Sequence, residues 1–140
     1  ATAFSPAHIT GFFKIYPNGS TGAGLNLEEG VTTTVNAVAA KKQKITIFIN
    51  GKKIPAATSW TVVKKYLEKI PQKFEIKVFH KTKIPIGYGL GASGSGAFSL
   101  SLALNKALQT KLSYKEAMKI AFHAEIENGT GLGDVVAQQF

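Results

Sequence analysis

The chain has 140 residues, of which 44% are hydrophobic and 18% charged, a composition typical of a single globular domain. It contains no cysteine, which excludes disulfides and thiolate metal sites and fits a reducing cytoplasm, where we expect the protein to act. No apolar run reaches the roughly 18 residues of a membrane-spanning helix, and no signal-peptide pattern opens the sequence, so we expect no membrane attachment.

The net charge is +9, and all 17 basic residues are lysine. These lysines are scattered along the chain as pairs and single residues. Arginine, whose planar guanidinium makes two-pronged contacts with bases and phosphates, does not occur in the sequence. We therefore favour a solvated basic surface that attracts anionic ligands over a surface that binds nucleic acid.

The first segment, residues 1–14, mixes short apolar runs with Pro6 and Gly11, and this pattern predicts two short strands around a bend. Residues 16–24 are rich in Asn, Gly, Ser and Thr, which predicts a loop. Backbone N–H groups in such a loop either face solvent or hold a substrate carboxylate. His8 is the one histidine of the segment, and a lone histidine is either structural or part of a site.

Three further strands are predicted. Residues 30–40 are rich in β-branched side chains, residues 44–49 indicate a second strand, and residues 74–79 alternate between apolar and polar residues. The dipeptide at 50–51, Asn-Gly, predicts a tight turn that folds residues 52–54 back as a hairpin.

Two amphipathic helices are predicted beside these strands. Ser59 is expected to cap the first, which Pro71 closes. Its apolar positions recur at helical spacing: Val62, Val63, Tyr66, Leu67 and Ile70. Ser113 and Glu116 have the spacing of a capping box, which opens a second helix that ends at 128–129, Asn-Gly. The mixed order of strands and helices predicts an α+β fold.

Residues 85–97 form the most informative stretch, because five glycines and two serines fall within them and an apolar run, 98–108, follows directly. An apolar helix that begins at a Gly/Ser loop is typical of a phosphate site, since the unpaired N–H groups of the first turn and the helix dipole attract anions. The loop lacks the Gly-Lys-Ser/Thr of a Walker A motif. It also lacks the acidic residue about 20 positions downstream that a dinucleotide-binding loop requires.

This loop resembles the ATP-binding loop of the GHMP kinases, the superfamily of galactokinase, homoserine kinase, mevalonate kinase and phosphomevalonate kinase. Their pattern is Pro-x-x-x-Gly-Leu-Gly-Ser-Ser-Ala-Ala. Ala92 replaces the first serine here, and Gly94-Ser95 replaces the alanine pair. The resemblance implies that ATP binds along ten positions: Pro85, Gly87, Gly89, Leu90, Gly91, Ala92, Ser93, Gly94, Ser95 and Gly96.

Two more stretches narrow the resemblance. Residues 5–13 and 20–24 resemble the start of archaeal pantoate kinases, and 123–138 resembles the second acidic motif of that family. The resemblance implies that the substrate is bound by residues of the first two stretches: His8, Thr10, Gly11, Ser20, Thr21 and Gly22.

The same resemblance implies three catalytic residues. Ser93 and Glu125 would hold Mg²⁺, and Asp134 would accept or orient the proton of the substrate alcohol. Ser95 competes with Ser93 for the metal, and Glu127 competes with Glu125. From the residues alone, the alternative for the two glutamates is a solvated helix end, although carboxylates there oppose the helix dipole and the pair favours a positive partner such as a metal. Asp134 could be an ordinary turn residue.

The implied fold is the GHMP-kinase N-terminal domain over residues 1–140, with a left-handed β-α-β unit. Members of the superfamily are twice as long, so we expect the C-terminal domain to be missing from the end of this chain. That domain would follow in the same polypeptide or come from a separate chain, and activity of this chain alone is not implied. An apolar face left bare by the missing half would favour self-association, so a homodimer is a further expectation.

The expected function is the ATP- and Mg²⁺-dependent phosphorylation of pantoate to 4-phosphopantoate, on the archaeal route to coenzyme A. One alternative keeps the fold but changes the acceptor to homoserine or a mevalonate-type acid. Another alternative is a basic binding module of the same fold without catalysis.

Overall fold

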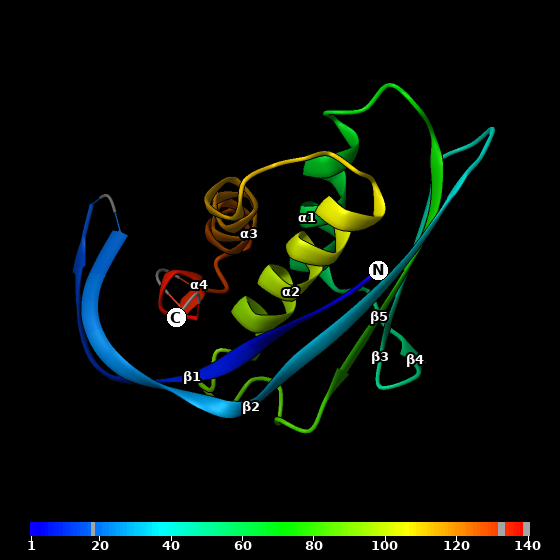
Figure 1. Ribbon diagram of the computed structural model, residues 1–140. Coiled ribbons are helices and arrows are strands. Elements are labelled where there is room, and N and C mark those ends of the chain that lie inside the picture. The colour runs from blue at the N-terminus through cyan, green and yellow to red at the C-terminus, as the bar shows by residue number, and fades with distance from the viewer. Residues whose placement is uncertain (18, 132–133, 139–140) are drawn as a thin grey trace.

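The computed structural model describes residues 1–17, 19–131 and 134–138. They form one five-stranded sheet with helices packed against one of its faces, which confirms the predicted α+β class (Figure 1). In chain order the elements are β1 (Thr2–Tyr16), β2 (Gly19–Ala39), β3 (Lys44–Ile49), β4 (Lys52–Lys53), α1 (Ala57–Leu67), β5 (Phe74–Thr82), α2 (Ala92–Ala107), α3 (Tyr114–Asn128) and α4 (Asp134–Ala137). Within these described ranges, no helix has the length and apolar character needed to cross a membrane.

The strand order in the sheet is β1-β2-β5-β3-β4. Strand β2 runs antiparallel to both β1 and β5, whereas β3 and β5 are parallel. Parallel neighbours need a crossover connection, and α1 supplies it between β3 and β5. The structure therefore contains a β-α-β unit of the kind that the resemblance implies.

Strands β1 and β2 form one long antiparallel ribbon, so the prediction of two short strands and a loop over 1–24 was wrong. Pro6 and Gly11 do not end the strand, because the ladder shifts its register beside each of them and absorbs both as irregularities. The Gly- and Ser-rich stretch pairs as a strand, with Ser20 opposite Ile15. Its weak strand propensity is overcome because each of residues 19–24 pairs with a residue of β1.

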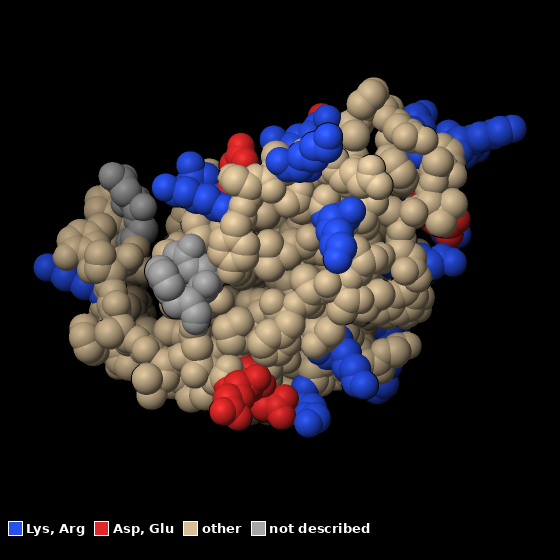
Figure 2. Space-filling model, in the orientation of Figure 1, with Lys and Arg blue, Asp and Glu red and all other residues tan. Residues whose placement is uncertain are grey.

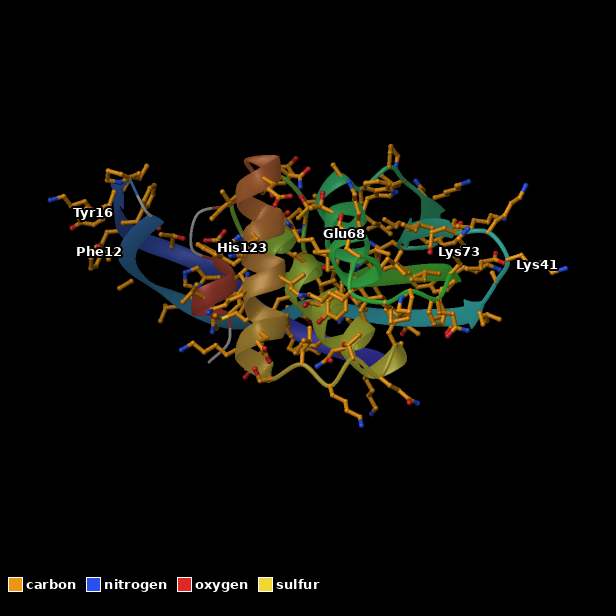
Figure 3. All side chains as sticks on the ribbon, turned by 90° about the horizontal axis from the view of Figure 1, so that it is seen from above. Phe12, Tyr16, Lys41, Glu68, Lys73 and His123 are labelled. Atoms are coloured by element: carbon orange, nitrogen blue, oxygen red, sulfur yellow. The ribbon has the colours of Figure 1, made fainter. Side chains whose placement is uncertain are left out.

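The far end of this ribbon extends beyond the helices and curves around α4 (Figure 1). Phe12 and Tyr16 lie there, at the opposite end of the molecule from Lys41 and Lys73 (Figure 3). The Phe12 side chain is 72% exposed. The ribbon is thus an apolar surface that the described part of the chain leaves bare.

The hairpin at Asn50 and Gly51 is confirmed. Their φ angles are 49° and 79°, the left-handed conformations that a tight two-residue turn requires. The Asn50 amide also donates to the Thr82 carbonyl over 2.9 Å and accepts from the Thr82 N–H over 3.0 Å. These two bonds attach the β3–β4 hairpin to the end of β5.

Helix α1 begins without the predicted side-chain cap. Ala56 is its N-cap, and Ser59 lies inside the first turn, where its hydroxyl contacts His80 Nε2 at 3.0 Å. The predicted apolar face is confirmed at Val62, Val63 and Tyr66, which are fully buried, but the helix ends at Leu67, so Ile70 lies beyond it. Ser59 therefore bonds to the buried His80 of β5 and does not form the cap of α1 that its sequence propensity predicts.

A polar cluster runs through the core beneath α1 and α2. Its centre is His80, whose Nδ1 lies 2.8 Å from Thr33 Oγ1, and that hydroxyl lies 2.6 Å from Ser99 Oγ. Burial lowers the pKa of His80 to about 4, so the ring is neutral at neutral pH. The hydrophobic core is built from apolar side chains of the sheet and the three long helices, among them Val35, Ile47, Ile76, Val78, Phe98, Leu100, Leu104 and Ala121.

Helix α3 follows its predicted boundaries. Ser113 and Glu116 form the capping box, in which each side chain accepts from the other residue's backbone N–H. Gly129, at φ 64°, closes the helix in the left-handed conformation. Gly129 thus fixes where α3 ends, and the last turn of the helix carries Glu125 and Glu127.

Candidate active site

The glycine-rich loop leads from β5 into α2 through three glycines in the left-handed conformation. Their φ angles are 88° at Gly87, 74° at Gly89 and 61° at Gly91, which is the N-cap of the helix. The Ser95 N–H donates to the Gly91 carbonyl over 2.9 Å, so the helical ladder starts there and the N–H groups of residues 92–94 precede it. At such a helix start the sequence predicts an anion.

The loop is attached to strand β1 by two hydrogen bonds. The His8 N–H donates to the Leu90 carbonyl over 3.1 Å, and the Ser95 hydroxyl donates to the Pro6 carbonyl over 2.6 Å. Ser95 is fully buried. Its hydroxyl is thus directed into the protein, which favours Ser93 over Ser95 as the residue that faces a ligand.

Ser93 and Glu125 lie in direct contact. The Ser93 hydroxyl donates to Glu125 Oε1 over 2.6 Å, and the Thr130 hydroxyl donates to the same oxygen over 2.7 Å. Glu125 is 1% exposed, and among the described residues its other oxygen, Oε2, has no hydrogen-bond partner. The carboxylate therefore keeps one buried oxygen available for a ligand.

Three influences set the acidity of Glu125. Burial, the largest, raises the pKa of its carboxyl above the usual range, the hydroxyls of Ser93 and Thr130 lower it, and the charge of Asp134 raises it again. A buried carboxylate with a nearby like charge is stabilised by a cation. This electrostatic setting suits a metal ligand.

Asp134 is the first residue of α4, and Gly131 lies next to both its carboxylate and that of Glu125. A Cβ built on Gly131 would lie 2.5 Å from Glu125 Oε2 and 3.8 Å from Asp134 Oδ2. A Cβ built on Gly94 would lie 3.3 Å from the Asp134 Cβ. Asp134 is therefore close to both the start of α2 and Glu125. Residues 132–133, directly before Asp134, lie outside the described residues.

Glu127 points to a different surface. It forms an ion pair with Lys65 of α1, and its side chain is 52% exposed. The geometry thus separates the two glutamates that the sequence left as alternatives, because Glu125 contacts Ser93 and Glu127 does not face the loop.

His8 lies beside the loop, and its orientation is held through Asn26. His8 Nδ1 is 3.0 Å from Asn26 Oδ1, and the Asn26 amide donates to the Ala137 carbonyl over 2.9 Å. Since Asn26 uses its N–H there and presents its oxygen to the ring, we assign the imidazole proton to Nδ1. Thr10 is two residues along the same strand, on the same side as His8.

The other residues expected to bind substrate are not gathered around the loop. Gly11 lies in the second irregularity of β1. Residues 20–22 pair with 13–15 in the far part of the ribbon, about 20 Å along the strand from His8. Their backbone groups belong to the β-ladder and do not form the predicted loop.

A cavity of about 250 Å³ opens beside the start of α2. Its walls come from β5, the start of α1 and the glycine-rich helix, and include Ile54, Ala57, Thr82, Ile86, Ala92 and Ser93. A second cavity of about 640 Å³ lies between β3 and α1, where Trp60 forms part of the wall. The two cavities share Ile54, Ala56 and Ala57, so they are neighbours.

Three residues at the site were missed by sequence reasoning: Thr130, Asn26 and Gln138. Thr130 and Gln138 lie within the stretch that carries the acidic residues, so their hydroxyl and amide were visible as polar groups near Glu125 and Asp134. Asn26 is 111 residues from its partner Ala137, and no sequence pattern links them.

The model of the GHMP kinases N terminal domain matches residues 57–140. The chain is 38% identical to the pantoate kinase of Methanocaldococcus jannaschii, over 96% of this chain and 49% of that protein. It is 34% identical to the pantoate kinase of Thermococcus kodakarensis, over 97% of this chain and 48% of that protein. It therefore spans about half the length of the curated relatives it matches.

A solved structure described as a phosphotransferase related to the CoA biosynthesis pathway superposes with a TM-score of 0.88 at 33% identity, over 98% of this chain and 49% of that one. The resemblance read from the sequence is thereby confirmed. The glycine loop, Glu125 and Asp134 all lie inside the range that the family model matches. This chain therefore belongs to the GHMP kinases and contains their N-terminal domain.

Proposed function

We propose that this protein, in its full-length form, transfers the γ-phosphoryl group of ATP to the terminal hydroxyl of pantoate. The observation that carries the proposal is the contact between Ser93 and Glu125 at the anion-binding start of α2, with Asp134 beside it. Similarity to pantoate kinases over nearly the whole chain supports the choice of acceptor.

The phosphates of ATP suit the glycine loop. The backbone N–H groups of residues 92–94 and the positive end of the α2 dipole face the position of an anion. The neighbouring cavity of about 250 Å³, with its mainly apolar walls, suits a nucleobase. In this arrangement the phosphates are held by backbone groups, so the loop needs no lysine.

Mg²⁺ fits the same residues. Ser93 Oγ and Glu125 are the hydroxyl and carboxylate that this ion takes alongside phosphate oxygens, and the unpartnered Glu125 Oε2 is a buried acceptor. Magnesium usually takes few protein ligands and is held largely by phosphate oxygens and water, so two side chains suffice. When bound, the ion neutralises the charge of the phosphates.

Asp134 is proposed to act on the acceptor. The pantoate hydroxyl oxygen attacks the γ-phosphorus, the bond from that phosphorus to the bridging oxygen breaks, and ADP leaves with the bond's electrons. Asp134 accepts or orients the proton of the hydroxyl. His8 and Thr10, on the strand that borders the loop, are proposed to contact the substrate carboxylate, with Gly11 and residues 20–22 more remote.

Homoserine and mevalonate-type acids are the competing acceptors. Similarity to pantoate kinases over nearly the whole chain favours pantoate among these acceptors. Four further expectations stay predictions: a second domain in the same or another chain, a homodimer, an archaeal source and a cytoplasmic location.

The surface charge bears on the alternative of a nucleic-acid-binding module. Lysines are spread over the face shown in Figure 2 and do not gather in one patch, which supports a solvated surface over a nucleic-acid-binding one.

The experiment is ADP release from Mg-ATP with pantoate, homoserine or mevalonate as acceptor. It compares the 140-residue chain with the complete product of its gene. We expect pantoate-dependent turnover in the complete product and its loss, by about a hundredfold or more, in Asp134→Asn. Turnover with homoserine or mevalonate alone would replace the acceptor, and no turnover with any acceptor would refute the proposal.

A further inference from the structure

Gln138 is a buried amide that lies between the glycine loop and the helix that carries Asp134. Its side chain is 2% exposed, and its Nε2 donates to the Gly91 carbonyl over 2.9 Å and to Ser95 Oγ over 3.0 Å. Its backbone N–H donates to the Asp134 carbonyl over 2.9 Å, one turn earlier in α4. One residue thus connects the N-cap of α2 to the turn that starts with Asp134.

The direction of these hydrogen bonds fixes the amide. The Ser95 hydroxyl gives its proton to the Pro6 carbonyl at 2.6 Å, so it accepts from Gln138. The Gly91 carbonyl also accepts, and only the –NH₂ end of the amide can serve both groups. A chain of hydrogen bonds therefore runs from α4 through Ser95 to strand β1.

Close packing holds the amide in place. Cβ atoms built on Gly91 and Gly94 would lie 2.7 Å and 2.8 Å from the two ends of the Gln138 amide. On its other side, α4 is held by the Asn26 amide, which donates to the Ala137 carbonyl over 2.9 Å. The short helix is therefore held from two directions, by the loop on one side and by the β1–β2 ribbon on the other.

We propose that Gln138 is a positioning residue. It fixes α4, and with it Asp134, against Gly91, the N-cap of helix α2 at the end of the glycine loop. A four-residue helix has too few internal hydrogen bonds to hold its own place. Gln138 supplies this support, because it ties the position of Asp134 to the carbonyl of the residue that starts the anion-binding turn. The inference rests on the proposed function, since it concerns the geometry between the phosphate site and the residue that acts on the acceptor.

The kinetic test compares Gln138→Met with Met118→Ala in the complete gene product. Methionine keeps the length of glutamine but removes both hydrogen bonds, and Met118 is a buried core residue of α3 outside the site. We expect Gln138→Met to lower kcat for pantoate by about tenfold or more, because small displacements of a catalytic group are costly. Met118→Ala should lower Tm by at least as much while kcat stays near the wild-type value. Equal losses of kcat in the two variants would overturn the proposal.

A second measurement does not depend on turnover. In the ¹⁵N-labelled 140-residue chain, the side-chain amide protons of Gln138 are compared with those of Gln72, which is exposed. We expect Gln138 to exchange with water at least about tenfold more slowly, and Ser95→Ala to speed that exchange. Equal exchange of the two glutamines would overturn the inference even if pantoate is phosphorylated. Slow exchange without turnover would instead reject the proposed function and leave the contact established.

Discussion

Ser93 and Glu125 connect the beginning of α2 to the end of α3 by a 2.6 Å hydrogen bond between residues 32 positions apart. The start of α2 gathers N–H groups that favour an anion, and the end of α3 disfavours the negative charge of Glu125. A cation placed between a phosphate at the start of α2 and the Glu125 carboxylate at the end of α3 would offset the negative charge of both groups. The pairing of these two residues, more than either one alone, is what makes the site suitable for a metal nucleotide.

The first prediction separates the two glutamates of α3. Glu125→Gln should weaken binding of Mg-ADP by about tenfold or more, since it replaces a charged ligand with a neutral one. Isothermal titration calorimetry with Mg-ADP, and with ADP in EDTA, measures the effect. Glu127→Gln is the matched control, because Glu127 pairs with Lys65 away from the loop, and it should bind like the wild type. Equal weakening in the two variants would contradict the assignment.

The second prediction concerns stability and the charge of Glu125. Burial raises the pKa of Glu125, so the folded protein holds that proton more tightly than the unfolded chain does. The contribution of this carboxyl to stability therefore falls as pH rises from the unfolded pKa, about 4.3, through the raised folded value. Glu125→Gln should raise Tm in the absence of metal, by an amount that grows with pH. Thermal unfolding across this range tests it, and a difference independent of pH would refute it.

The third prediction concerns His80 and has the opposite sign. Burial lowers the pKa of His80 from 6.5 to about 4, so the unfolded chain takes up a proton first as the pH falls. Stability should drop between these two values, by roughly 3 kcal/mol in full, at about 1.4 kcal/mol per pH unit. Urea unfolding at several pH values measures it. His80→Gln should remove this part of the pH dependence and His123→Gln, at an exposed position, should not. An unchanged profile in His80→Gln would show that other groups cause the loss.

The fourth prediction compares two glycines of α2. A Cβ on Gly96 would meet nothing nearer than His80 at 3.9 Å, so Gly96→Ala should raise the stability by up to about 1 kcal/mol through helix propensity. A Cβ on Gly94 would lie 2.8 Å from Gln138 Oε1 and 3.3 Å from the Asp134 Cβ, so Gly94→Ala should lower it. Differential scanning calorimetry of both variants tests this contrast. A stabilised Gly94→Ala would mean that α4 does not pack where the structure has it.

Local signals in the sequence predicted much of this architecture. The capping box at Ser113, the Asn50-Gly51 turn and the glycine loop each depend on neighbouring residues, and all three were confirmed. Ser59 was assigned wrongly, because its partner His80 lies 21 residues away on another element and competes with the cap. The β1–β2 ribbon was underestimated for the same reason, since ladder pairing compensates for Gly and Ser in a strand.

In the candidate site, too, local motifs were predictable from the sequence and contacts between distant elements were not. Motif resemblance named Ser93, Glu125 and Asp134, but it could not choose between Glu125 and Glu127, two residues apart on one helix. That choice depends on which side of α3 faces α2 and which faces Lys65, a matter of packing. Asn26 and Gln138 were missed because their roles arise from contacts between distant elements.

Strand β1 lies at one edge of the sheet and carries exposed apolar side chains such as Phe12 and Ile15. An exposed apolar edge strand of this kind can pair with strands of other chains and so cause aggregation. Its ladder is interrupted beside Pro6, and the His8 N–H of this edge is already bonded to the Leu90 carbonyl. The glycine loop therefore also covers part of an open sheet edge. Changes that loosen this loop would be expected to lower the solubility of the protein as well as its affinity for nucleotide.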